Sequence, residues 1–289
     1  MSNAVDGGAA GLRRIWLCAD DYGLSPAVNR GIRDLVARGR INATSCMVVA
    51  PSMLRSEAVS LEVLNAVAPR VSIGLHLTLT APFRPLSAGF RPLREAAFPS
   101  FTTLIRDAVL RRLDPAALLQ EVRSQLRAFH ELFGRMPDFV DGHRHVQLLP
   151  QVRDAVLLAV KEAAPGAWVR QCGRVLPLAA RLADKKGLLL DLFSSGFRAR
   201  AATLGIATNP AFAGTYDFDP AVDFAALFPR FLQGLPDGGL VMCHPGFVDG
   251  ELQRLDPLTT LREKEHGYLI SDAFTADLAA RGLALAKPS

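Results

Sequence analysis

The sequence predicts an α/β protein, a single distorted (β/α) barrel of the TIM type with parallel strands inside and helices outside. Short apolar runs of strand type alternate with helical stretches, as in parallel sheets whose strands are joined by crossover helices. Four of the expected strands end in Asp or His, and barrel enzymes carry their reactive groups at the carboxyl ends of several strands. An open, doubly wound sheet is the alternative that the same alternation allows.

A strand followed by a capped helix begins the ordered part of the chain. Residues 14–19 (RIWLCA) are apolar after the arginine and are expected to form a buried strand. Ser25 then provides an N-cap with Pro26 at the first helical position. The helix is expected over residues 26–38. Residues 81–100 contain four prolines and are expected to form a long loop near a site. By the same criteria we expect strands at residues 44–50 and 71–77 and a helix at residues 56–68.

The second part of the chain continues this alternation. Residues 115–133 form the clearest amphipathic helix, with an apolar stripe that includes Leu118 and Phe129 and with Gly134 at its end. Residues 194–219 are rich in Gly, Ala and aromatic side chains and fit no single element. The remaining strands are expected at 139–142, 168–171, 239–243 and 283–285. Helices are expected at 151–163 and 271–281, and a helical region is expected between the strand at 168–171 and about residue 192.

Composition and charge exclude several classes of protein. Hydrophobic residues make up 49% and charged residues 21% of the chain, which is typical of a soluble globular protein and not of a disordered one. The apolar stretches are shorter than the ~18 residues that a membrane span needs. The net charge of +5 comes from Arg and Lys residues that occur singly or in pairs. Without a basic tract, a nucleic-acid partner is not expected.

The same features predict the domain organisation and the compartment. No repeat or linker divides the 289 residues, so we expect a flexible tail at residues 1–13 and one barrel domain at residues 14–289. The four cysteines lie in apolar runs or lack a nearby partner, as free thiols do in a reducing compartment, and we therefore expect a cytoplasmic protein. A small molecule is the expected partner, and a homodimer is left open.

Acidic and imidazole side chains stand at the ends of four expected strands. Asp20 and Asp21 follow the first strand, His76 lies near the end of the third, and His143 and His244 follow two later ones. A lone Asp pair is more often helix N-terminal acidity, and a lone His on a strand is more often a hydrogen-bonded core residue. We favour a site because parallel strands bring all these ends to one face.

One carboxylate and two imidazoles form a common open site for a divalent metal ion. Asp21 is the candidate ligand. Asp20 is the candidate base, because a bound metal ion lowers the pKa of its water towards ~7 and a neighbouring carboxylate then accepts the proton. His244 precedes Pro245, which holds the backbone extended, and is the candidate general acid.

The segment DGHRH, residues 141–145, carries two further imidazoles. His143 and His145 lie two positions apart and share one face of an extended chain, with a carboxylate at the start of the segment close enough to orient a ring. His130 and His266 lie in polar helical stretches and are expected at the surface.

Four motifs together resemble a known family. In chain order the sequence contains CADDYGLS at 18–25, GLHLTLT at 74–80, DGHRHV at 141–146 and MCHPG at 242–246. These resemble the successive motifs of the YdjC-like carbohydrate deacetylases. Each motif is weak alone, whereas the four in this order are specific, and the likeness spans about residues 14–286.

The resemblance implies a distorted (β/α) barrel enzyme, a hydrolase that removes the N-acetyl group from an acetylated amino sugar. It also implies a divalent metal ion, Mg²⁺ in first place with Zn²⁺ as the alternative. Family members often have His where this chain has Arg144 and Gln147, so the contacts of this loop with the substrate are expected to differ. By position, the resemblance implies metal ligands at Asp21, His76 and His143, the base at Asp20, the acid at His244, and substrate contacts at Arg170 and His145.

Two other functions stay open on the sequence alone. A metal-dependent phosphoester hydrolase also uses Asp and His, but such a site more often holds two metal ions. A sugar-binding relative without catalysis has no need of both Asp20 and Asp21.

Overall fold

A computed structural model describes residues 12–67, 71–90, 96–175 and 185–286. Its strands are β1 (Arg13–Tyr22), β2 (Ala43–Cys46), β3 (Ser72–Leu77), β4 (Phe139–Gly142), β5 (Trp168–Val169), β6 (Phe212–Ala213), β7 (Leu240–Cys243) and β8 (Leu283–Leu285). Its helices are α1 (Pro26–Ala37), α2 (Arg55–Val67), α3 (Phe101–Val109), α4 (Pro115–Phe133), α5 (Val152–Ala163), α7 (Lys185–Leu204), α8 (Phe224–Phe231), α9 (Gly250–Leu255), α10 (Thr260–Ile270) and α11 (Asp272–Ala280), with a 3₁₀ segment η1 (His143–Leu148).

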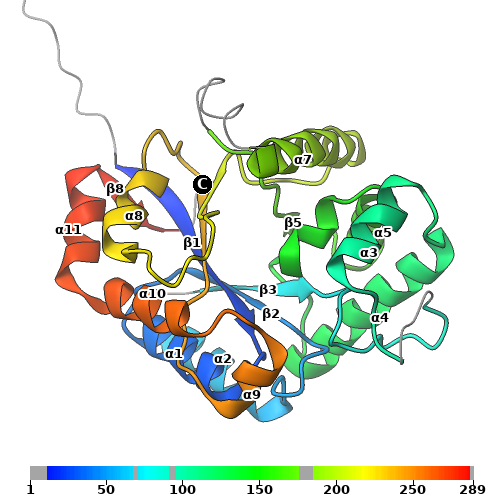
Figure 1. The fold of residues 1–289 in the computed structure, drawn as a ribbon, viewed down its shortest axis with the longest axis horizontal. Helices are drawn as coiled ribbons and strands as arrows, with labels where there is room; N and C mark the ends of the chain where they lie inside the picture. The colour runs from blue at the N-terminus through cyan, green and yellow to red at the C-terminus, as the bar shows by residue number, and fades with distance from the viewer. Residues whose placement is uncertain (1–11, 68–70, 91–95, 176–184, 287–289) are drawn as a thin grey trace, which may run out of the picture.

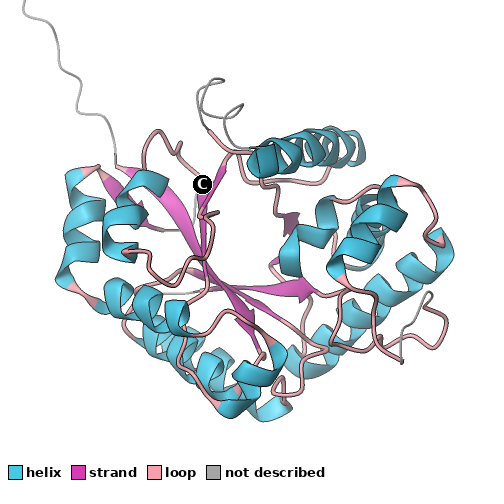
Figure 2. Cartoon of the chain, in the orientation of Figure 1, coloured by secondary structure: helices cyan, strands magenta, loops and turns pink. Residues whose placement is uncertain are grey.

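The described strands form one parallel sheet in the order β5-β4-β3-β2-β1-β7-β6. The central strand β1 pairs with β8 over residues 13–15 and with β7 over residues 16–19. Isolated parallel bridges join Val169 to Thr208 and Arg174 to Phe212, so the edge at β5 meets the edge at β6. Helices surround this curled sheet (Figures 1 and 2). The distorted barrel predicted from the sequence is confirmed.

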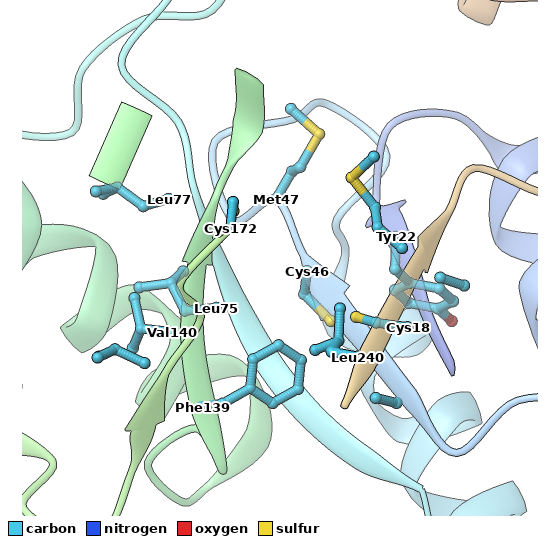
Figure 3. Packing of buried hydrophobic residues seen from close by; sticks show 14 of the residues in the cluster. Cys18, Tyr22, Cys46, Met47, Leu75, Leu77, Phe139, Val140, Cys172 and Leu240 are labelled. Atoms are coloured by element: carbon cyan, nitrogen blue, oxygen red, sulfur yellow. The ribbon is translucent and has the colours of Figure 1, made fainter. Parts of the chain in front are cut away.

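Aromatic side chains fill the barrel where several strands begin. The ring centroids of Phe139 and Trp168 lie 4.5 Å apart, and those of Trp16 and Trp168 lie 5.6 Å apart. Gly74 leaves room for this packing, because a Cβ atom there would lie 2.5 Å from the Phe139 ring. Figure 3 shows Phe139 and Cys18 among the side chains of one buried cluster.

The same strands carry charged groups at their other ends. On each of four strands, an ionisable residue follows a residue of the aromatic layer after an even number of positions. The pairs are Trp16 and Asp20, Gly74 and His76, Phe139 and Asp141, and Trp168 and Arg170. Because side chains alternate between the two faces of a strand, these groups share the interior face of the barrel. The sheet therefore gathers ionisable side chains at the carboxyl ends of its strands.

Most predicted elements are confirmed, with ends shifted by a few residues. The helix over 115–133 and the strands over 139–142 and 283–285 have the predicted bounds. The strand expected over 44–50 stops at Cys46 because the chain turns there. The elements to which the sequence assigned no bounds are α3, β6, α8, α9 and α10. Of these, α10 contains the polar helical stretch expected around His266, and helix α7 continues to Leu204.

The structure also tests the positions expected for individual cysteine and histidine side chains and for the N-terminal tail. All four cysteines are buried and free, as predicted. His130 is exposed, but the surface position expected for His266 is wrong, because its ring is buried and its Nε2 lies 3.0 Å from Asp34. Most of the tail expected over residues 1–13 lies outside the described residues, and Arg13 already belongs to β1. Among the described helices, none combines the length and apolar character needed to cross a membrane.

Candidate active site

The end of β1 contains a bulge that shapes the site. Residue pairing with β2 runs from Cys18 and Ala19 and then shifts before Tyr22, and Asp21 has φ 69°. In a regular strand, successive side chains point to opposite faces. The bulge re-aims one residue, so Asp20 and Asp21 both face the end of the barrel, and both are buried.

Asp21 lies between two imidazoles from neighbouring parts of the sheet. Its Oδ1 atom is 3.3 Å from His76 Nε2 and 3.2 Å from His143 Nδ1. One donor atom from each of these residues lies within 4.8 Å of the others, and the three side chains are buried. A carboxylate oxygen and two imidazole nitrogens at this spacing match the donor set of a divalent metal site.

A second carboxylate orients the His76 ring. His76 Nδ1 is 2.6 Å from Asp141 Oδ1 and 3.0 Å from Ser45 Oγ. Burial alone would lower the pKa of His76, but the carboxylates of Asp141 and Asp20 outweigh it and raise the pKa to about 10. With Nδ1 held by Asp141, the other nitrogen is directed to Asp21, as in metal sites whose histidines are oriented by a carboxylate. The sequence placed Asp141 close to the imidazoles of its own segment, DGHRH; the ring that it contacts in the structure is instead His76 of the neighbouring strand.

Asp20 is held by a buried arginine. Arg170 donates from Nη1 and Nη2 to the two oxygens of Asp20 at 2.7 and 2.8 Å, and its Nη1 lies 3.0 Å from Asp141 Oδ2. Burial raises the pKa of Asp20, but the guanidinium outweighs it and holds the pKa well below its usual range. Arg170 lies beneath the pocket and not in its lining, so its position suits the fixing of Asp20 and not the substrate contact implied by the resemblance.

His244 follows β7 and faces the same space. The side chain lines the pocket, and its Nδ1 atom is buried without a hydrogen-bond partner among the residues that the structure describes. The Phe218 ring stands edge-on to it at 5.4 Å between centroids. Burial lowers the pKa of His244, with the carboxylates of Asp21 and Asp20 acting in the opposite direction.

The backbone after β4 differs from the extended chain that the sequence predicted. His143 begins the 3₁₀ segment η1, and Arg144 and His145 have φ angles of 55° and 58°. The two imidazoles therefore point differently: His143 meets Asp21, whereas His145 Nδ1 lies 3.5 Å from Cys172 Sγ. Burial and the Arg170 charge lower the pKa of His145 to about 3, so this ring is neutral.

Helix α10 contributes two buried groups that sequence reasoning missed. Arg262 donates from Nη2 to Asp21 Oδ2 at 2.7 Å, and its charge holds the pKa of Asp21 well below its usual range against the effect of burial. Glu265 accepts hydrogen bonds from the Tyr216 hydroxyl and the His244 backbone amide. No motif marks either residue, and the polar helical stretch around His266 was expected at the surface, so the sequence offered no signal for them.

One pocket of about 520 Å³ lies above these groups, at the carboxyl ends of the strands. Arg262, Arg144 and Phe218 also line it. Of the seven predicted site residues, the six that line this pocket are Asp20, Asp21, His76, His143, His145 and His244.

Fold and site define a class, the α/β barrels with an Asp–His–His cluster at the carboxyl ends of their strands. The family model described as YdjC-like protein matches residues 14–280. The chain belongs to this family, and the resemblance seen in the sequence motifs is confirmed.

Individual relatives agree with this assignment. The chain is 26% identical over 269 residues to a chitooligosaccharide deacetylase of Citrobacter koseri, which covers 86% of this chain and 94% of that protein. It is 28% identical over 240 residues to a chitooligosaccharide deacetylase of Yersinia pestis, which covers 81% of this chain and 82% of that protein. A solved structure from Enterococcus faecalis, provisionally named a cellobiose-phosphate cleavage protein, superposes with a TM-score of 0.73 at 20% identity, covering 95% and 97% of the two chains.

Proposed function

We propose that this protein is a metal-dependent carbohydrate deacetylase. Its substrate is an N-acetylated amino sugar, an N-acetylglucosamine oligosaccharide or conjugate. The observation that carries the proposal is the Asp21–His76–His143 cluster, with the ionised Asp20 and the His244 ring in the same pocket. The names of the curated relatives support the reaction and the sugar.

The donor set of the cluster fits a divalent metal ion. Asp21, His76 and His143 would hold it, and we propose Mg²⁺, with Zn²⁺ as the alternative. Such an ion would supply a Lewis acid and lower the pKa of a water molecule beside it. A second cluster, formed by Cys18, Asp20 and Asp141, is already paired with the Arg170 guanidinium, so we expect one metal ion per chain. A phosphoester hydrolase would more often bind two.

The side chains divide the proton transfers of amide hydrolysis between them. Asp20, kept ionised by Arg170, accepts a proton from the attacking water. His244 delivers a proton to the nitrogen as the bond between the carbonyl carbon and the nitrogen breaks. Water is consumed, and acetate and a free amino sugar are released. His145 and Arg144, which line the η1 side of the pocket, would contact the sugar.

Replacement of the proposed base tests the mechanism. Asp20→Asn removes the proton acceptor and leaves the three metal donors in place. We expect acetate release from N-acetylglucosamine oligomers to fall by about 10²–10⁴-fold in kcat, as for loss of a general base, while the metal content stays at one per chain. Asp154→Asn, which alters an exposed carboxylate of α5, is the matched control.

Two results would count against the proposal. One is wild-type protein with stoichiometric metal that releases no acetate from any N-acetylglucosamine oligomer or conjugate. The other is Asp20→Asn protein as active as wild type, which would remove Asp20 from the mechanism. A count of two metal ions per chain would favour phosphoester hydrolysis.

We further propose that residues 14–289 act as one domain in the cytoplasm. The site draws on residues from Asp20 to Glu265, and β8 pairs with the beginning of β1, so a cut within this span would divide the site or the sheet. The four free, buried thiols support a reducing compartment.

A further inference from the structure

We propose that Glu265 is a positioning residue that fixes the His244 ring in the pocket. It does so by holding, at the same time, the backbone of His244 and the chain segment that carries Phe218. The inference rests on the proposed function, because it concerns the side chain to which proton delivery is assigned there.

The Glu265 carboxylate joins three segments that meet at one wall of the pocket. It lies on α10 and is fully buried. Its Oε1 accepts a hydrogen bond from the Tyr216 hydroxyl at 2.6 Å, and its Oε2 accepts one from the His244 backbone amide. The Tyr216 ring packs on Phe218 with centroids 4.3 Å apart, and Phe218 stands edge-on to the His244 ring. One carboxylate therefore acts on the ring through its backbone and through its aromatic neighbour.

The His244 ring lacks the usual means of orientation. The ring of His76 is held by Asp141 and Ser45 at Nδ1, whereas in the described part of the chain His244 Nδ1 is buried without a hydrogen-bond partner. A ring without a side-chain partner keeps its direction only through its backbone and its packing. Both of these depend on Glu265, and displacement of a catalytic group by about 1 Å can cost 10²-fold in rate.

Protonation of Glu265 would disturb this arrangement. A carboxylate accepts both hydrogen bonds. When Glu265 is protonated, the oxygen that faces Tyr216 becomes a donor, so the tyrosine hydroxyl must turn and accept, and the carboxyl group loses the charge that strengthens its bond to the His244 amide. Burial raises the pKa of Glu265 to about 7, against the hydrogen bonds that it accepts. The groups that face it are Arg262 on its own helix, Tyr216 after β6, Cys243 on β7 and Asp20 on β1.

The substitution Glu265→Gln tests the proposal, because it keeps the shape of the side chain and removes its charge, so the bond to the His244 amide weakens and the Tyr216 hydroxyl must turn to accept. We expect kcat to fall about 10–100-fold, as for other residues that orient a catalytic group, with KM and metal content unchanged. Tyr216→Phe should cause a smaller loss of kcat and, by removing a donor to the carboxylate, should move the acidic limb of the kcat profile to higher pH. Thermal unfolding shows whether each variant is folded.

Glu121→Gln is the matched control. Glu121 is also a buried helical glutamate that accepts backbone amides, from Leu86 and Ser87, but these partners do not line the pocket. The control should keep the wild-type kcat. Equal losses in Glu121→Gln and Glu265→Gln, or a wild-type kcat in Glu265→Gln, would overturn the proposal.

A spectroscopic measurement separates this proposal from the proposed function. In ¹⁵N-labelled protein, the His244 amide proton should move upfield in Glu265→Gln, and its shift should titrate near pH 7 in the wild type only. Neither result needs an active enzyme. A His244 amide that is unchanged by the substitution contradicts the positioning role, whereas absence of acetate release with the expected amide shifts contradicts only the proposed activity.

Discussion

Arg170 illustrates how a single residue sets the chemistry of the site. Its guanidinium is completely buried and contacts the carboxylates of Asp20 and Asp141. Asp20 keeps its negative charge in a buried position because this cation is fixed beside it. Asp141 in turn orients His76. One arginine thus supports both the proposed base and one proposed metal ligand.

Removal of this cation should cost both stability and activity. Arg170→Met leaves two buried carboxylates without their partner, and we expect the free energy of unfolding in urea to fall by about 3–5 kcal/mol. The pKa of Asp20 should rise, so protonation of Asp20 should make the fall of kcat steeper on the acidic side of the limb that Glu265 sets. Arg170→Lys, which retains a positive charge, should lose less of both.

The control is Arg200→Met, which breaks the exposed pair with Asp154 and should change stability by less than about 1 kcal/mol. If Arg170→Met unfolds at the same urea concentration as wild type, the buried ion pairs of Arg170 do not stabilise the folded protein.

Helices and strands that carry their own signals in the local sequence could be predicted, whereas those that depend on tertiary contacts could not. Helix α4 has a Pro at its first turn, an apolar stripe and Gly134 at its end with φ 71°, and both ends were predicted correctly. The two-residue strand β6 has no such signal, because Phe212 and Ala213 are extended only through pairing with β7. Helix α10 buries one face, but this face includes Arg262, Glu265 and His266, so polar residues interrupt the apolar stripe that would mark the helix in the sequence.

The chain segment after β6 makes a close contact with β7. Gly214 has φ 107°, and a Cβ atom there would overlap the carbonyl oxygen of Met242. We expect Gly214→Ala to lower the free energy of unfolding by about 2–3 kcal/mol, because the side chain adds backbone strain and a clash with a rigid strand. Activity should fall as well, since Tyr216 and Phe218 lie just beyond this glycine.

Gly234→Ala is the control for Gly214→Ala. Both glycines have a positive φ angle, but an added methyl group would clash with a neighbouring strand only at Gly214. Gly234 has φ 67°, and a methyl group added there would meet no atom within 4 Å, so its substitution should cost only about 1 kcal/mol. Equal stability losses in the two variants would show that the contact with Met242 is unimportant.

At the scale of the whole molecule, the barrel encloses a carboxylic acid that titrates in the neutral range. Because the pKa of Glu265 is raised from 4.5 to about 7, the folded state binds this proton more tightly than the unfolded chain does. The stabilisation from the proton is complete below about pH 4.5 and is lost as the pH rises through 7.

Comparison of stability across pH checks this directly. Relative to wild type, Glu265→Gln should gain up to about 3 kcal/mol in free energy of unfolding between pH 4.5 and pH 8, at 1.36 kcal/mol per pKa unit. The contributions of Asp20 and Asp21 are common to both proteins and cancel in the difference. Parallel stability curves for the two proteins would contradict a raised pKa at Glu265.

The sequence by itself determined the alternation of strands and helices and the residues that end the strands. Both are local properties: apolar periodicity defines the elements, and the period of two along a strand defines its interior face. For this reason the barrel and six pocket-lining residues were predicted before the structure was known.

Only the tertiary structure decided which group each of these residues meets. Arg170 binds Asp20 from 150 residues away, and Arg262 binds Asp21 from 241 residues away. The bulge at Asp21 and the left-handed turn at His145 redirected side chains that an extended chain would aim elsewhere. Such pairings arise when the sheet curls and brings strand ends and α10 together, and nothing in the local sequence encodes them.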